Sequence, residues 1–414
     1  MVDFLGNVAA SAQLPDCEVA LILTATGEIS LFGFERSFDA PGAALVMGTA
    51  GALLQAHDVF QGGGNHPSSC VIPAAWVSAQ EHDRSDVELL QALVAGYEVT
   101  NRLAAATYPH QQLRGSAPTG TAGAVGAATA AGLLAGLDPD QLAAAIGSAA
   151  FLAPLSSYQG LRDHGSAVPI HGGYAARTGI EAVRVAAAGF SAGGRILEGD
   201  ANSPGFLSFL GGSPEGLAED EWNGETLDSI TFKLMPACFS NHPILEAGLK
   251  LLAEGRVRAD DIETVVVRAA APMLRLVETG PGPELELYDR LMSLRWTLAL
   301  LLQHGRYGVR EVLSLRDSTT TKKLVSRIEI EPAADLAELF PQEMGVDLTV
   351  TLGSGECRRT NYRRSLSGPL VAAGSMKDVD CKRLRAKYVD FCHAGRVSDE
   401  AASHQLDRWI TNFK

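Results

Sequence analysis

The sequence predicts a mainly α-helical protein with a mixed α+β segment in its C-terminal half. Between about residues 41 and 225, apolar residues recur at helical spacing with almost no strand signal. Dense runs of β-branched residues appear later, at 262–270 and 346–356. Helical spacing returns over 376–409, where charged residues lie on one side. We therefore expect a helical part to about residue 225, an α+β segment over about 230–365, and a final helix pair.

The helical part is expected to begin with a short helix at residues 3–10 and two short strands, or an extended arm, within 18–34. Ser85 and Glu88 have the spacing of a capping box, so a helix should begin there. The longer helices are expected at 43–56, 71–81, 85–107, 121–137, 138–152 and 174–188. Glycine and alanine are abundant, which fits helices that pack closely together.

The α+β segment should contain both long helices and strands. The helices are expected at 243–254 and 291–304, and the strands at 262–270, 326–332 and 346–356. Glycines at 353 and 355 should turn the last of these strands. We find no internal repeat and no low-complexity linker along the chain.

The composition describes a large globular protein. The chain has 414 residues, of which 46% are hydrophobic and 6% aromatic, so a large packed core is expected. Its net charge of −14 argues against nucleic acid as a partner, because phosphate binding needs a basic surface. No apolar stretch is long enough to span a bilayer, and no signal peptide is visible. We therefore expect a cytoplasmic protein that does not bind a membrane.

The cysteines are scattered and form no CxxC pair, which argues against a zinc cluster or a disulfide framework. They are Cys17, Cys70, Cys238, Cys357, Cys381 and Cys392. We expect free thiols in a reducing compartment. The sequence also lacks a P-loop, a dinucleotide fingerprint, a G-x-S-x-G motif and an HExxH motif.

The stretch 51–70 carries the densest group of side chains suited to chemistry. An apolar helical run ends in Gln55, His57 and Asp58, and His66 follows a glycine triplet. Glycines let the backbone approach a ligand closely. Two histidines and a carboxylate beside such a turn suit proton transfer near neutral pH. The alternative from residue types alone is a polar helix end followed by a loop.

Six stretches, taken in this order, resemble segments of the MmgE/PrpD family. They are SLFGFERSFDAPGAALVMGTAGALL, NHPSSCVIPAAWVSAQE, LLQALVAGYEVTNRL, PIHGGYAARTGIEAVRVAAAGF, TFKLMPACFSNHPILEA and RIEIEPAADLAELFPQEMGVDLTVTLGSGE. The resemblance implies a large all-α helical domain built from both chain ends, 1–228 and 369–414, and a smaller α+β lid domain at 229–368. It also implies an active site between the domains, a small-molecule substrate, no cofactor, and a homodimer.

Several family residues are retained. The histidine of the His-Pro-Ser motif corresponds to His66, the histidine of the Leu-His-x-Gly turn to His171, and the Lys-x-x-Pro lysine to Lys233. Asp58 stands where the family has the last of three aspartates. Cys238 stands where the decarboxylase branch has histidine and the dehydratases more often have cysteine.

Other family residues are replaced. The first two aspartates correspond to Gln55 and His57, and a tyrosine to Trp296. A family histidine and a family lysine correspond to Ala117 and Val168. The last two changes remove cationic partners for substrate carboxylates. The resulting expectation is a specialised substrate, of the kind found in secondary metabolism.

The resemblance assigns roles to the candidate catalytic residues His66, Lys233, Asp58 and His57. His66 is expected to transfer the proton, with Asp58 orienting a histidine or taking the proton itself. Lys233 would stabilise the developing charge; the alternative is a structural salt bridge. His57 changes the charge of the site. The candidate substrate-binding residues are Gln55, Ser116, Tyr158, Arg162, His171, Cys238 and Trp296.

Some of these assignments have structural alternatives. Cys238 suits a buried packing thiol, and His171 suits a structural role in its turn. Tyr158, Arg162 and His164 lie in the polar loop expected at 155–173, and long loops are often functional. Arg162 or His164 would be the replacement for the lost cations.

The leading functional hypothesis is a cofactor-free lyase that catalyses β-elimination, like a dehydratase, on a small or medium acidic or carbonyl substrate. The alternatives are an epimerase, isomerase or decarboxylase on the same scaffold. A non-catalytic member that binds a ligand or a partner enzyme is the third hypothesis.

Overall fold

The protein contains two compact units. The structure is a computed structural model that describes residues 1–163, 165, 167–218, 222–255, 257–275, 277, 286–314, 318–338, 340, 343–365 and 377–411. Unit 1 comprises Met1–Leu53, His57–Phe232 and Val371–Lys414, and unit 2 comprises Leu54–Ala56 and Lys233–Leu370. The expected domain boundaries, 228/229 and 368/369, lie a few residues before the changes of unit at 232/233 and 370/371.

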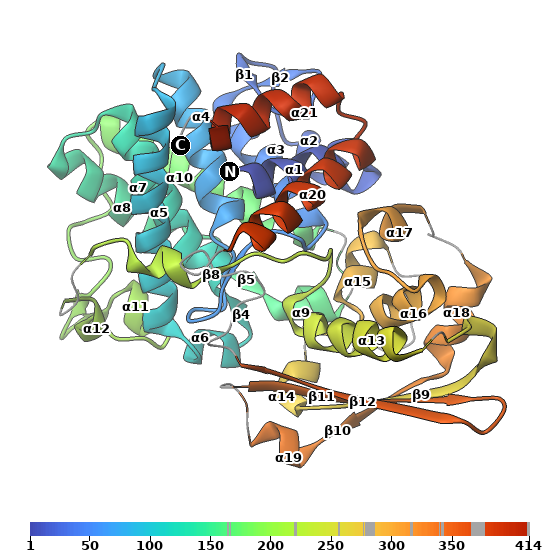
Figure 1. Cartoon of the computed structure of the whole chain (residues 1–414). Coiled ribbons are helices and arrows are strands. Elements are labelled where there is room, and N and C mark those ends of the chain that lie inside the picture. Colours follow the sequence, from blue (N-terminus) through green and yellow to red (C-terminus); the bar gives the residue numbers. More distant parts are fainter. Residues whose placement is uncertain are drawn as a thin grey trace. The chain divides into compact units, whose positions relative to one another are not determined.

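Helices form most of unit 1, and α7 lies among α4, α5, α8 and α10 (Figure 1). The longer ones are α1 (Val2–Ser11), α3 (Ala40–Leu53), α4 (Ser68–Glu81), α5 (Asp86–Thr107), α7 (Pro118–Ala135), α8 (Pro139–Leu152), α10 (His171–Ala187), α20 (Asp378–Ala394) and α21 (Asp399–Leu406). The expected capping box at Ser85 and Glu88 is confirmed, and Asp138 with Gln141 forms a second one at α8. The predicted helices are therefore present, with ends shifted by a few residues.

Small residues let the helices of unit 1 approach closely. Every residue of α3 is buried. At the crossing with α10, a Cβ added at Gly173 would stand 2.2 Å from the backbone oxygen of Leu45. At the crossing of α7 and α10, a Cβ added at Gly179 would stand 2.6 Å from the Cβ of Ala127. The glycine and alanine content is thus explained by backbone-to-backbone packing.

The two chain ends meet in unit 1. Helix α20 packs on α1, which also contacts α3 (Figure 1). Across this contact, Lys387 Nζ donates to Asp3 Oδ1 at 2.6 Å, and both side chains are almost completely buried. Burial lowers the pKa of Lys387, while Asp3 opposes that change. A buried charge of this kind requires its partner, so this ion pair fixes the register of the two helices.

Three expectations for unit 1 need correction. The stretch 18–34 holds a short helix, α2 (Glu18–Leu21), and only one strand, β1 (Ile29–Ser30). The domain is also not purely helical, since two-residue strands form short antiparallel pairs: β1 with β2 (Ser37–Phe38), β3 (Val59–Phe60) with β8 (Ile230–Thr231), β4 (Ser116–Ala117) with β5 (Ser156–Ser157), and β6 (Gly199–Asp200) with β7 (Ser203–Pro204).

The third correction concerns the polar loops, which contain short helices because their ends are held by local backbone hydrogen bonds. These helices are α6 (His110–Leu113), α9 (Tyr158–Arg162) and a 3-10 turn at Val168–Ile170. Two further short helices follow, α11 (Phe206–Phe209) and α12 (Glu215–Ala218), and a π-helical turn lies at Asp407–Thr411.

Unit 2 is built on a four-stranded sheet in the order β10-β9-β11-β12. The strands are β9 (Ile262–Ala269), β10 (Ile328–Pro332), β11 (Glu343–Leu352) and β12 (Cys357–Ser365). β10 runs parallel to β9, and the other neighbours are antiparallel. Val265, Val267, Leu348 and Val350 are completely buried. Helix α13 (His242–Glu254) contacts β11 and β12, which accounts for the alternation of buried and partly buried residues along β11.

Short and medium helices complete unit 2. They are α14 (Ala271–Leu274), α15 (Leu287–Met292), α16 (Leu294–His304), α17 (Val309–Ser314), α18 (Thr319–Ser326) and α19 (Ala334–Ala337). The helix expected at 291–304 is therefore two helices, separated at Ser293, whose side chain caps α16. An α-rich α+β fold is confirmed for the chain.

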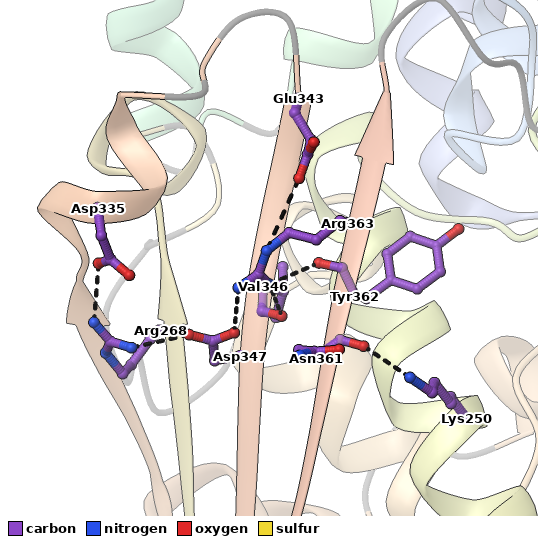
Figure 2. A network of polar contacts seen from close by, with 9 residues as sticks. All are labelled: Lys250, Arg268, Asp335, Glu343, Val346, Asp347, Asn361, Tyr362 and Arg363. Carbon is purple, nitrogen blue, oxygen red and sulfur yellow. Dashed lines mark hydrogen bonds and ion pairs between the residues drawn. The ribbon is translucent and has the colours of Figure 1, made fainter.

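Charged side chains of alternating sign cross the sheet of unit 2 (Figure 2). Arg268 binds Asp347 at 2.9 Å and Asp335 at 3.0 Å. Arg363 binds the other oxygen of Asp347 at 2.8 Å, and Glu343 lies 3.9 Å from it. This network joins β9, β11, β12 and α19, and it places charge on the edge strand β12, which disfavours strand addition there.

Within the described part of the chain, every helix is too short or too polar to cross a membrane. The six cysteines all carry free thiols.

Candidate functional site

A turn between residues 57 and 66 of unit 1 brings the predicted histidines together. Phe60 N donates to Asn65 O at 2.9 Å, and the glycines between them close the turn, with Gly64 at a φ of +62° that suits glycine. β3 pairs with β8 at the base of the turn. As a result, the rings of His57 and His66 lie 4.4 Å apart between centroids.

The hydrogen bond at His66 fixes its tautomer. His66 Nδ1 lies 2.6 Å from the backbone oxygen of Asp58. Since a carbonyl only accepts, Nδ1 carries the hydrogen, and the lone pair of the neutral ring is on Nε2. The backbone N–H of His66 donates to Thr119 Oγ1 at 3.1 Å. The partly buried imidazole is therefore oriented as a base or acid acting through Nε2.

The side chain of Asp58 is held by other groups. Ser68 donates to Oδ1 through its hydroxyl at 2.6 Å and its backbone N–H at 3.1 Å. Tyr97 donates its hydroxyl to Oδ2 at 2.9 Å. Burial raises the pKa of the Asp58 carboxyl, and the Ser68 and Tyr97 bonds offset part of that rise. Asp58 thus contacts His66 through its backbone, and its carboxylate anchors the turn to α4 and α5.

The first turns of three long helices meet around His66. Ser69 of α4 donates its hydroxyl to the His66 carbonyl at 2.9 Å, and Thr119 of α7 accepts from the His66 N–H. A Cβ added at Gly172 of α10 would stand 2.6 Å from Ser69 Oγ, so that helix also begins here. Helix N-termini carry partial positive charge and favour anions. Three such N-termini therefore lie close to His66.

In unit 2, Lys233 and Gln55 lie together in the interior. Lys233 is completely buried and donates to the backbone oxygen of Gln55 at 3.1 Å. The side-chain amide of Gln55 donates to the Tyr288 hydroxyl at 2.8 Å. Gln55 has a φ of +52°, in the left-handed region that non-glycine residues seldom adopt. Contacts on both its main chain and its side chain hold it there.

Cys238 and Trp296, the other two predicted site residues of unit 2, have different neighbours. Cys238 is buried, and burial raises the pKa of its thiol, while Lys233 acts in the opposite direction. Cys238 is therefore a neighbour of Lys233. Trp296, on α16, has its ring under the guanidinium of Arg290 at 4.8 Å from the centroid.

The remaining predicted residues of unit 1 are spread over two segments. Ser116 is buried in β4 and accepts from Gln111 Nε2 at 3.1 Å. Tyr158 begins α9, and its backbone N–H donates to Gly115 O at 2.8 Å, which keeps it beside β4. Arg162 ends α9 with an exposed side chain. His164 lies outside the described residues.

His171 is the first residue of α10, which corrects the expectation that it lies in a turn. Burial lowers the pKa of His171 to about 4, so its ring is neutral near physiological pH. It precedes Gly172, which packs against Ser69.

Two family models match most of the chain: the MmgE/PrpD N-terminal domain over residues 1–215 and the MmgE/PrpD C-terminal domain over residues 235–385. The chain belongs to the MmgE/PrpD family. It is similar to a cis-aconitate decarboxylase of Homo sapiens, with 27% identity over 331 residues, which are 76% of this chain and 66% of that protein.

It is also similar to the cis-aconitate decarboxylase-like protein oryM of Aspergillus oryzae, with 26% identity over 192 residues, which are 44% of this chain and 39% of that protein. The chain thus spans less than two thirds of the length of each of these relatives.

For this MmgE/PrpD chain, sequence reasoning missed four residues that support the site: Ser68, Tyr97, Thr119 and Tyr288. Ser68 and Tyr97 lie inside stretches that carry the family resemblance, so the motif held a signal. Thr119 follows a loop that was considered for Ser116 alone. Tyr288 carries no motif, and it is 233 residues from its partner Gln55.

Among the described residues of this family member, we find no cluster of three or more His, Cys, Asp or Glu side chains placed to hold a metal ion.

Proposed function

We propose that this MmgE/PrpD protein is a lyase that removes a proton from a carbon beside a carboxylate and eliminates a β-substituent, as a dehydratase does. The substrate is a small or medium organic acid. His66 is the acid/base and Lys233 stabilises the negative charge that develops. The relatives named cis-aconitate decarboxylase support a carboxylate substrate, and proton transfer beside a carboxylate suits decarboxylation as well.

The observation that carries this proposal is the hydrogen bond from His66 Nδ1 to the Asp58 carbonyl at 2.6 Å. It presents a basic Nε2 in a fixed orientation, which is what a general base needs. The second histidine, His57, lies beside it with a ring-centroid separation of 4.4 Å. The Asp58 carboxylate is occupied by Ser68 and Tyr97 and is assigned no proton-transfer role.

Two features support an anionic substrate. The first is the set of helix N-termini around His66 in unit 1, which supply partial positive charge where Ala117 and Val168 supply none. The second is the buried ammonium of Lys233 in unit 2.

The proposed step balances in protons and electrons. Nε2 of His66 takes the proton, and the electron pair of the C–H bond forms the alkene as the bond from the β-carbon to the leaving oxygen breaks. The proton on His66 passes to that oxygen, so water leaves and the histidine is regenerated. Lys233 stabilises the enolate-like charge on the carboxylate oxygens during this step.

The test is an incubation in D₂O with a panel of hydroxylated di- and tricarboxylates and cis-aconitate, followed by NMR and CO₂ detection. A new alkene indicates elimination, CO₂ release indicates decarboxylation, and deuterium in recovered substrate without either indicates epimerisation. His66→Asn should lower the rate by about 10²–10⁴-fold. Lys233→Met should lower it by about 10²–10³-fold.

Matched controls are His82→Asn and Lys250→Met, since both residues are exposed. They should retain activity. Absence of elimination with every substrate of the panel, or full activity of His66→Asn, would refute the proposal. If none of the three reactions occurs, a purely ligand-binding member is the better account.

A further inference from the structure

The hydroxyl oxygen of Tyr288 accepts a hydrogen bond. The Gln55 amide donates to it at 2.8 Å, so the hydroxyl's own hydrogen is not used in that bond. Among the described residues, no acceptor for this hydrogen lies within hydrogen-bond distance of Tyr288. The side chain is 7% exposed. Buried hydroxyl groups normally have a partner, so this hydrogen is suited to bind an acceptor on a ligand.

The phenol remains a donor at physiological pH. Burial raises the pKa of Tyr288, and the neighbouring Cys238 and Asp289 act in the same direction. The group is therefore a neutral O–H, which suits donation to an oxygen that carries negative charge.

Tyr288 and Lys233 are both bound to Gln55. Lys233 donates to the backbone oxygen of Gln55, and the Gln55 side chain donates to Tyr288. Gln55 has the left-handed backbone conformation, which is unfavourable for a residue with a Cβ. Such strain is kept where surrounding contacts impose it, and it is concentrated at ligand sites. A buried ammonium and a buried hydroxyl are thus held on one rigid residue.

Trp296, the residue that sequence comparison placed at the family tyrosine, is not equivalent. Its ring is stacked under Arg290, and it lines a cavity of about 20 Å³. A cavity of that size holds one water and no substrate group. The hydroxyl that position 296 lacks is present in unit 2 at Tyr288, on α15.

We propose that Tyr288 is a substrate-binding residue that donates its hydroxyl hydrogen to a substrate carboxylate, alongside Lys233. This inference rests on the proposed function only for the identity of the ligand as an organic acid. It assigns to Tyr288 the contact that the sequence had placed on Trp296. Gln55 acts as the positioning residue for both donors.

The test is a binding experiment that does not depend on turnover. The full-length protein is labelled at tyrosine Cζ with ¹³C, and the Tyr288 signal is assigned with Tyr288→Phe. Succinate, maleate and cis-aconitate are then titrated as probes. At least one probe should shift the Tyr288 signal, and Tyr288→Phe should weaken its binding by about ten- to a hundred-fold, as expected for loss of a hydrogen bond to a charged group.

Tyr307→Phe is the matched control. Tyr307 is also in unit 2, but its hydroxyl donates to the Pro236 backbone oxygen at 2.9 Å. Its loss should lower thermal stability and leave probe affinity within two-fold. Thermal melts of both variants establish that they fold before their affinities are compared.

Three outcomes would overturn the inference: no shift of the Tyr288 signal with any of the probes, unchanged affinity in Tyr288→Phe, or loss of affinity in Trp296→Phe instead. Binding through Tyr288 without any product in the turnover assay would uphold this inference and refute the proposed reaction. The two failures are therefore distinguishable.

Discussion

Replacing Tyr97 by phenylalanine should destabilise unit 1 by removing one anchor of the Asp58 carboxylate. The Tyr97 hydroxyl donates to Asp58 Oδ2 at 2.9 Å, and Asp58 is 3% exposed. A hydrogen bond to a charged group contributes about 1.5–3 kcal/mol. We therefore expect Tyr97→Phe to lower the free energy of unfolding by about 2 kcal/mol at neutral pH.

The loss should depend on pH, with a sign set by Asp58. Burial raises the pKa of Asp58 above its ordinary value, so the folded protein binds more protons than the unfolded chain between the two values, and stability falls as pH rises through that range. The Tyr97 bond opposes this because it favours the carboxylate. Without it the pKa of Asp58 rises further, so the difference between variant and wild type should grow with pH and shrink in acid.

The measurement is urea unfolding at several pH values, with Tyr108→Phe as the control. Tyr108 is also partly buried, and among the described residues its hydroxyl has no hydrogen-bond partner. In the double variant Ser68→Ala/Tyr97→Phe, the loss in free energy of unfolding should differ from the sum of the two single losses, because both hydroxyls bind the same carboxylate. If Tyr97→Phe costs no more than Tyr108→Phe, or if its cost is the same at every pH, the anchoring role of Tyr97 is wrong.

Three further predictions concern other parts of the fold. Burial lowers the pKa of His171 to about 4 from 6.5, so the unfolded chain binds more protons between these values, and stability should fall by at most about 3 kcal/mol as pH drops through them. His171→Asn should flatten that slope in urea unfolding; an unchanged slope would contradict it. Gly173→Ala should cost about 3 kcal/mol or prevent folding, because its Cβ would stand 2.2 Å from a backbone oxygen of α3, whereas Gly194→Ala, with no atom within 4 Å, should cost under about 0.5 kcal/mol in the same assay. Asp347→Asn, which breaks contacts with two arginines on neighbouring strands, should cost about 1 kcal/mol in low salt and less in high salt, and a salt-independent cost would argue against an electrostatic origin.

The long helices and the strands of unit 2 were predictable because their signals are local. Capping residues such as Ser85 and Asp138 begin helices through contacts three residues away, and apolar spacing marks the buried face. The prediction of two short strands or an extended arm at 18–34 was wrong for its first residues. Tertiary packing there overrides the preference of β-branched residues for strands. Residues 18–21 form a turn of helix against α3, with Cys17 and Ala20 completely buried.

The strand pairs β3–β8 and β4–β5 were not predictable, because each depends on a partner far along the chain. β3 pairs with β8, about 170 residues later, and no periodicity can develop over two residues. The same reason separates the predicted from the missed site residues. His57, Asp58 and His66 belong to one turn, whereas Tyr97 and Tyr288 reach the site only through tertiary packing.

The turn at 57–66 explains how the chain keeps its family frame while changing the side chains within it. The orientation of His66 is set by the backbone carbonyl of residue 58, which any amino acid supplies. The turn itself is closed by the backbone bond between Phe60 and Asn65. Neither contact uses the side chain of residue 57, although the His57 ring lies beside that of His66. Asp58 is different, because its carboxylate holds the turn to α4 and α5.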